Sequence, residues 1–239
     1  MVIRRIPIVF LLVAGVSLGC ATPDTVDRVR TGGEEAGDAG SSPAGETQGA
    51  GGLARLGNAP RVVFLGDSLA YGLGLARDEA VPALIQARLD EAGLHYQSVN
   101  RGVSGDTSAA GLRRLDLALE GDVRLVVLEL GANDMLRGLQ PAQMEDNLRA
   151  IIERCLERNI EVALTGMEAL PNYGEAYTRE FREVFSGLAD EYGLVLVPFF
   201  LEGVAGDPEL NQRDMMHPNA RGARIVADNL WRVLEPILE

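Results

Sequence analysis

Three short polar sequences could together supply a nucleophile and a binding site for negative charge. Ser68 lies in Gly-Asp-Ser-Leu, Gly105 in Ser-Gly-Asp-Thr and Asn133 in Gly-Ala-Asn-Asp. A serine hydroxyl can act as a nucleophile, while a glycine backbone amide and an asparagine side-chain amide can donate hydrogen bonds to an oxyanion. Each residue also has an ordinary structural explanation, because Ser and Asn often cap helices and Gly often forms turns. The hypothesis therefore depends on whether the fold brings them together.

A serine nucleophile needs a general base, and the chain has two histidines, His95 and His217. His217 ends the sequence Asp-Met-Met-His that begins at Asp214. A carboxylate at that spacing in a turn can hold Nδ1 of the imidazole and leave Nε2 facing a serine. His95 is expected at the amino end of a strand, on the surface and far from the three polar sequences. We therefore expect His217 to be the base and Asp214 to orient it.

Apolar runs alternate with helical patterns after residue 60, which is typical of a parallel sheet covered on both faces. We expect strands at residues 61–66, 95–100, 123–130, 160–165 and 194–197, and helices at residues 79–92, 107–119, 141–159, 175–192 and 220–238. This pattern predicts a three-layer, doubly wound α/β fold with strand order 2-1-3-4-5, as in flavodoxin-like proteins. The three polar sequences then follow the carboxyl ends of neighbouring strands.

The first twenty residues resemble an export signal. Arg4 and Arg5 precede an uncharged apolar run, residues 6–19, which is too short to span a bilayer comfortably. The run ends in Gly19-Cys20, which resembles a bacterial lipobox and implies that Cys20 is lipidated and anchors the protein to a membrane. An ordinary cleaved signal peptide is the alternative. Either leader implies a periplasmic or cell-envelope protein.

The composition then changes twice along the chain. Residues 21–59 are rich in Gly and acidic residues and have few large apolar ones, so they predict a flexible linker. Residues 60–239 have the composition of a folded domain. The whole chain has 239 residues and a formal net charge of -13, which argues against binding nucleic acid. Two cysteines exclude a disulfide-rich scaffold, and we expect Cys155 not to be bonded to Cys20.

Four sequence blocks, in order along the chain, resemble those of the SGNH hydrolase family, also called GDSL esterases. The blocks are Gly66-Asp67-Ser68-Leu69, Gly105, Gly131-Ala132-Asn133-Asp134 and Asp214-Met215-Met216-His217. Four further stretches are similar to the bacterial arylesterase, lysophospholipase and acyl-CoA thioesterase group: residues 104–108, 136–141, 170–174 and 198–200. The resemblance extends over residues 61–239.

The resemblance implies hydrolysis of carboxylic esters or thioesters through an acyl-enzyme on Ser68, without a metal or other cofactor. His217 would be the base and Asp214 its orienting carboxylate. The backbone amides of Ser68 and Gly105 and the side chain of Asn133 would form the oxyanion hole. A small acyl ester is the substrate that this chemistry predicts.

The loops after strands 123–130 and 160–165 are expected to form the mouth of the site. Their apolar side chains are candidates for substrate binding, with ordinary loop packing as the alternative: Leu136, Leu139, Leu170 and Tyr173. A carbohydrate or peptidoglycan O-acetylesterase uses the same machinery and remains an alternative, as does a tethered binding domain outside the enzymes.

Two other catalytic patterns do not match the sequence. The α/β-hydrolase pattern Gly-x-Ser-x-Gly fails because Ala70 stands at its last position. The dinucleotide pattern Gly-x-Gly-x-x-Gly fails because Arg77 stands at its last position. No spacing typical of a metal-ligand set is present, so no metal is expected.

Glu129 is a carboxylate within the strand expected at residues 123–130. A buried carboxylate is costly unless it is paired. We therefore expect a structural ion pair with Arg101 or with an arginine on a covering helix, and a catalytic role is the alternative.

Overall fold

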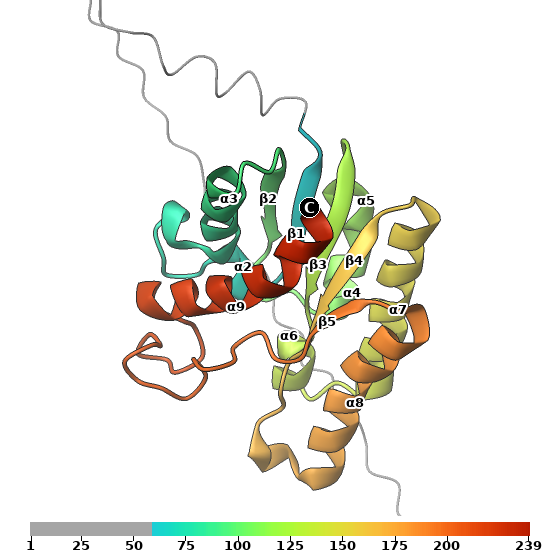
Figure 1. Ribbon diagram of the computed structural model, residues 1–239. Coiled ribbons are helices and arrows are strands. Elements are labelled where there is room, and N and C mark those ends of the chain that lie inside the picture. Colours follow the sequence, from blue (N-terminus) through green and yellow to red (C-terminus); the bar gives the residue numbers. More distant parts are fainter. Residues whose placement is uncertain (1–58) are drawn as a thin grey trace, which may run out of the picture. The chain divides into compact units, whose positions relative to one another are not determined.

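The computed structural model describes residues 59–239, and its centre is a sheet of five parallel strands (Figure 1). The strands are β1 (Arg61–Gly66), β2 (Gln97–Gly102), β3 (Val123–Glu129), β4 (Glu161–Thr165) and β5 (Val195–Val197). They are arranged in the order β2-β1-β3-β4-β5, which confirms the predicted fold class and strand order. In such a sheet the winding direction changes between β1 and β3, and ligands bind beyond the carboxyl ends of the strands near that point.

Helices cover the sheet on both faces. They are α2 (Ser68–Tyr71), α3 (Val81–Glu91), α4 (Ser108–Arg113), α5 (Leu115–Ala118), α6 (Ala132–Leu136), α7 (Pro141–Glu157), α8 (Glu175–Tyr192) and α9 (Ala220–Leu238), with 3-10 turns at Arg77–Glu79 and Pro171–Tyr173. Helix α3 packs against α9, which crosses in front of the strands in Figure 1, while α4 packs against α7 and α7 against α8. The result is the three-layer arrangement that right-handed crossover connections produce.

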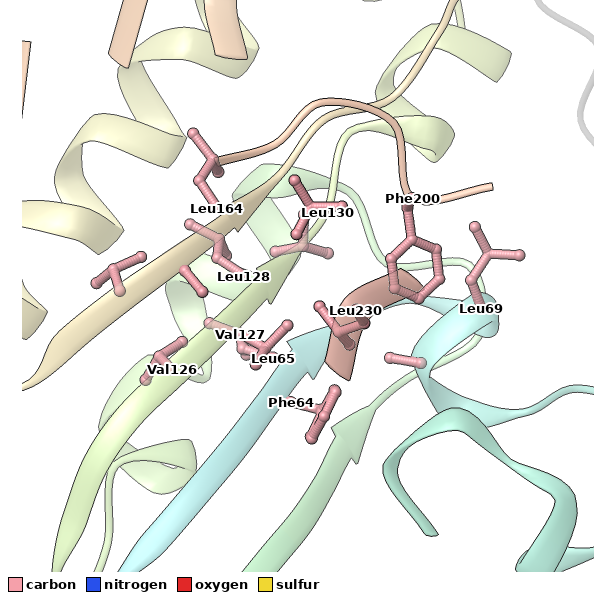
Figure 2. Close-up of a cluster of buried hydrophobic side chains, with 14 of the residues drawn as sticks. Phe64, Leu65, Leu69, Val126, Val127, Leu128, Leu130, Leu164, Phe200 and Leu230 are labelled. Carbon is pink, nitrogen blue, oxygen red and sulfur yellow. The ribbon is translucent and has the colours of Figure 1, made fainter. Parts of the chain in front are cut away.

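The central strands are buried on both faces because helices cover both. Figure 2 shows Phe64 and Leu65 of β1 and Leu128 of β3 in one apolar cluster, together with Leu230 of α9 and Phe200, which follows β5. These side chains are at most 2% exposed. Burying a side chain of this size contributes about 1.5–3 kcal/mol, so the cluster holds the carboxyl ends of β1 and β3 firmly in place.

Most of the expected elements agree with the structure, and the departures have physical causes. The strand at residues 61–66 and the helices at 175–192 and 220–238 have the expected bounds. The strand expected at residues 95–100 begins at Gln97 instead, because it is a half-buried edge strand with a weak apolar pattern. The short helices α2 and α6 were not expected as elements.

The expected helix at residues 107–119 is in fact two helices, α4 and α5. The chain leaves helical geometry at Arg114, where φ is -106° and ψ is 10°. The Arg114 guanidinium is drawn toward the strand ends, where it donates to the carbonyl oxygens of Gly66 and Arg101. These tertiary hydrogen bonds outweigh the local preference for a continuous helix.

Within residues 59–239, no helix is both long and apolar enough to cross a membrane.

Candidate active site

Ser68, His217 and Asp214 form a continuous series of hydrogen bonds. Ser68 is the first residue of α2, directly after β1, and its Oγ lies 2.8 Å from Nε2 of His217. On the other side of the imidazole, Nδ1 lies 2.7 Å from Oδ2 of Asp214. Ser68 and His217 are 149 residues apart in the sequence. This geometry allows the imidazole to take a proton from Ser68 while Asp214 fixes its orientation.

The turn that contains Asp214 holds its carboxylate in this position. Its Oδ1 accepts hydrogen bonds from the backbone N–H groups of Met216, at 3.0 Å, and His217, at 3.1 Å. These hydrogen bonds, with the one to the His217 ring, lower the pKa of Asp214 to about 2. The carboxylate therefore stays charged at neutral pH, which favours an imidazole with a proton on Nδ1. The turn also holds Met215 at a φ of 61°, a region that few non-glycine residues adopt.

Three N–H donors lie at the carboxyl ends of β1, β2 and β3. Within residues 59–239, the backbone N–H groups of Ser68 and Gly105 donate to no protein acceptor. The side-chain amide of Asn133 donates one hydrogen bond, to Oδ2 of Asp67 at 2.8 Å. A primary amide has two N–H bonds, so the second remains available. Donors of this kind stabilise an oxyanion because they need no reorganisation when the charge develops.

The functional and structural explanations of the Gly-Asp-Ser-Leu sequence both hold, but for different residues. Asp67 is the N-cap of α2, with Oδ1 accepting from the N–H of Leu69 at 2.9 Å. Ser68 does not cap the helix, and its hydroxyl faces His217 instead. Gly66 is required by close packing, since a Cβ there would lie 2.6 Å from both Ala70 and the carboxyl group of Glu129.

Side chains that sequence reasoning did not single out fasten these turns to one another. Arg114 joins the turns after β1 and β2, because it also donates to the Asp106 carboxylate at 2.5 Å. Asp134 joins the turns after β3 and β2, accepting from the N–H and hydroxyl of Ser108 at 2.7 and 2.6 Å. Arg137 donates to the carbonyl oxygen of Gly105 at 2.7 Å. Asp134 lies within the third block and Arg137 within the stretch 136–141, whereas no sequence pattern indicated a role for Arg114.

The expected ion pair of Glu129 with Arg101 is wrong. Oε2 of Glu129 accepts hydrogen bonds from the backbone N–H groups of Asp67, at 3.1 Å, and Ala70, at 3.2 Å. No arginine forms a salt bridge with Glu129 in the described part of the chain, and Nε of Arg101 is buried without a hydrogen-bond partner. Burial and the neighbouring Asp67 carboxylate raise the pKa of Glu129 well above its usual value.

The four candidate substrate-binding residues divide into two kinds. Leu136 and Leu170 are each 46% exposed and free to contact a ligand. Tyr173 is half-buried and stacks on Tyr177, with ring centroids 5.1 Å apart. Leu139 is also half-buried, and its carbonyl oxygen accepts a hydrogen bond from the Tyr177 hydroxyl at 2.8 Å. The two mouth loops are thus joined to each other through Tyr177.

Exposed apolar side chains gather at the same end of the sheet. A hollow beside Ser68 and His217 is lined by Leu69, Leu73 and Phe200. Large exposed apolar residues occur in the segments that follow each of the five strands: Tyr71, Leu73, Val103, Leu136, Leu170, Met215 and Met216. An apolar rim of this kind suits a substrate with an apolar portion.

The remaining predicted residues lie away from the site or outside the described part. His95 is exposed and precedes β2, at the amino end of the sheet, as expected. Cys155 is a free, buried thiol on α7. Cys20, the signal and nearly all of the linker lie outside residues 59–239. Within that range, no group of three or more His, Cys, Asp or Glu side chains could hold a metal ion.

Comparisons with known proteins agree with this geometry. Residues 64–225 match the GDSL-like Lipase/Acylhydrolase family. The chain is 41% identical over 181 residues to the esterase TesA of Pseudomonas aeruginosa, covering 75% of this chain and 90% of the relative. It is 37% identical over 185 residues to the thioesterase 1/protease 1/lysophospholipase L1 of Escherichia coli, covering 77% and 88%.

A solved structure supports the same assignment. A crystal structure of TesA, 40% identical in sequence, superposes with a TM-score of 0.71 over 74% of this chain and 99% of that one. The family match at residues 64–225 includes the turns that carry Ser68 and Asn133. The chain therefore belongs to the GDSL-like lipase/acylhydrolase family, the SGNH hydrolases, and is a serine hydrolase of carboxylic esters.

Proposed function

We propose that Ser68 is the nucleophile of a two-step acyl transfer, with His217 as general base and Asp214 as the residue that orients it. The observation that carries this proposal is the 2.8 Å contact between Ser68 Oγ and His217 Nε2, continued at 2.7 Å to Asp214. In the first step Oγ attacks the ester carbonyl as its proton passes to Nε2. His217 then gives that proton to the leaving alcohol or thiol, and an acyl-enzyme remains.

In the second step water repeats the attack on the acyl-enzyme. His217 takes a proton from the water, and Ser68 leaves with that proton as the acid is released. In both steps the developing oxyanion accepts hydrogen bonds from the backbone N–H groups of Ser68 and Gly105 and from the side chain of Asn133. These donors act mainly on the transition state, since the substrate carbonyl carries far less charge.

We propose that the preferred substrate carries an apolar acyl chain. The support is the apolar rim around the site, in which Leu136 and Leu170 are each 46% exposed. The relatives named esterase, lysophospholipase and thioesterase agree with such a substrate, whether oxygen ester or thioester. The test is a comparison of kcat/KM for acetyl, octanoyl and longer esters of one leaving alcohol. A preference for acetyl would instead favour an O-acetylesterase.

We propose export to the cell envelope, with Cys20 as a lipid-bearing residue. The support is the sequence alone: two arginines, an uncharged apolar run and Gly19-Cys20. The test is labelling of cells with a fatty-acid probe, with Cys20→Ala as the matched variant. Label on the native chain and none on the variant is the expected result. An unlabelled, exported chain that begins after another residue would contradict the anchor but not the export.

A further inference from the structure

Glu129 lies directly beneath the nucleophile turn although the proposed reaction does not use it. It is the last residue of β3 and pairs in register with Gly66, the last residue of β1. Its side chain is fully buried, and Oε2 accepts from the N–H groups of Asp67 and Ala70, one on each side of Ser68. A carboxyl group in such a place costs folding free energy unless all its polar atoms are satisfied.

The second carboxyl oxygen of Glu129, Oε1, indicates the protonation state of the group. Oε1 is buried and accepts no hydrogen bond from any donor in the described part of the chain. Neither oxygen of Glu129 forms a salt bridge within residues 59–239, and the Asp67 carboxyl group is the charged neighbour that, after burial, raises the pKa of Glu129. Two neighbouring carboxylates can only accept hydrogen bonds and repel each other, so one of the two groups carries a proton.

The proton belongs to Glu129. The oxygens of Asp67 already accept from the Leu69 N–H, at 2.9 Å, and from the Asn133 amide, at 2.8 Å, and both hydrogen bonds favour the charged form. A proton on Oε1 of Glu129 makes that buried, unpartnered atom a donor, and the neighbouring Asp67 carboxylate can accept from it. Asp67 then holds the single negative charge of the pair.

The hydrogen bonds therefore run from β3 through the nucleophile turn to Asn133 in α6, the short helix after β3. Oε2 of Glu129 accepts from the Asp67 N–H, and Oδ2 of Asp67 accepts one of the two N–H bonds of Asn133. That acceptor fixes the rotation of the Asn133 amide, so its other N–H has one direction. We propose that Glu129, as a neutral carboxylic acid, is a positioning residue that acts through Asp67 to direct the Asn133 amide toward the oxyanion.

This inference rests on the proposed role of Asn133, and the experiment separates the two. Glu129→Gln keeps the shape, since its amide oxygen can accept from Asp67 and Ala70 while its N–H donates to the Asp67 carboxylate. We expect kcat within about threefold of the native value. Glu129→Leu removes both functions, and we expect kcat to fall by about 10- to 100-fold, the scale of a misplaced catalytic group, with KM within about threefold.

Thr165→Val is the matched control for loss of a buried polar group. Thr165 lies at the end of β4, 1% exposed, and its hydroxyl donates to the carbonyl oxygen of Leu128 at 3.2 Å; within residues 59–239 its hydroxyl forms no hydrogen bond with Asp67 or Asn133. The control is expected to lower the melting temperature and to leave kcat per folded molecule unchanged. Circular dichroism gives the folded fraction of each variant.

The double variant Glu129→Leu/Asn133→Ala decides whether the effect passes through Asn133. If it does, the double variant is no slower than Asn133→Ala alone. The proposed role of Asn133 fails if Asn133→Ala keeps the native kcat. The positioning role fails by itself if Asn133→Ala is slow while Glu129→Leu is not, if the two losses multiply, or if Glu129→Gln is as slow as Glu129→Leu.

An infrared measurement tests the inference even if Glu129→Leu does not fold. The native protein at neutral pH should show the C=O band of a buried, protonated carboxyl group, and Glu129→Gln should lack it. Identical carboxyl bands in the two proteins would overturn the proposal.

Discussion

The two sides of the active site are constructed in different ways. The nucleophile side, residues 66–70, is held from a distance: Glu129 accepts from its backbone, and Arg114 donates to its carbonyl group. The histidine side is a local turn in which Asp214 accepts from two backbone N–H groups and from His217 within three residues. The first side is buried, whereas the Asp214 side chain is 38% exposed.

This difference predicts how each side responds to change. Groups that fasten the nucleophile side are part of the buried fold, so altering them should affect stability and activity together. The histidine turn makes most of its hydrogen bonds to itself, so altering it should affect activity far more than stability. Variants of the two sides test this separation.

The largest effect is expected from the two residues that exchange the proton. Ser68→Ala and His217→Ala should each lower kcat by about 10⁴- to 10⁶-fold, because neither residue works without the other. The double variant should then be no slower than the worse single variant. Steady-state kinetics in the presence of a chelator measures this, and melting temperatures show whether the fold is intact. A Ser68→Ala protein that keeps more than a few per cent of native activity would refute the assignment.

Asn133 gives the next largest effect and separates catalysis from turn formation. As an oxyanion donor it acts on the transition state, so Asn133→Ala should lower kcat by about 10²- to 10³-fold with little change in KM. Asn133→Asp should be at least as damaging, since a carboxylate lacks the donor and repels the oxyanion. If both variants react normally and only melt earlier, Asn133 is a turn residue and the oxyanion assignment is wrong.

Arg114 should show the coupling expected of the nucleophile side. Arg114→Met removes the hydrogen bonds to two carbonyl oxygens and to the Asp106 carboxylate, which should cost about 2 kcal/mol of stability and lower the melting temperature by about 4–8 °C. Displacement of the turns should also lower kcat by about tenfold.

Arg137→Met is the control for Arg114→Met. Arg137 makes a single exposed hydrogen bond, to the Gly105 carbonyl, so its loss should change stability by less than about 0.5 kcal/mol. Equal loss of stability in the two variants would mean that Arg114 does not hold the strand ends together.

The smallest effect is a pH dependence of stability on the histidine side. The pKa of Asp214 in the folded protein is about 2, below its ordinary value of 3.8, so its charged form stabilises the fold above pH 4. That contribution is lost as pH falls from about 4 through about 2. The difference in unfolding free energy between native protein and Asp214→Asn should therefore shrink as pH falls over this range. At neutral pH the difference should be less than about 1 kcal/mol, because the Asp214 carboxylate is exposed to solvent.

Urea denaturation at a series of acidic pH values measures this difference. Ser68→Ala, which keeps Asp214, should follow the native curve. A constant difference between native protein and Asp214→Asn across the range would contradict the assigned cause.

Much of the fold could be predicted because its pattern is local. The strand at residues 61–66 is a continuous apolar run that ends in Gly. The helices at 175–192 and 220–238 keep an amphipathic pattern over their whole length. The helix expected at 107–119 failed, since hydrogen bonds of Arg114 with distant carbonyl groups break it. The local sequence pattern does not show that tertiary hydrogen bonds will compete with the helix.

Residue types and their spacing are enough to identify the residues that could do the chemistry. Ser68, Asn133, Asp214 and His217 follow from residue type, spacing and place after a strand, because parallel strands bring their carboxyl ends together whatever the details of packing. How these residues are held depends on contacts between segments that are far apart in the sequence. The protonation of Glu129 depends on which atoms face it across the sheet, and the energy of a buried carboxyl group is set by those neighbours rather than by its sequence context.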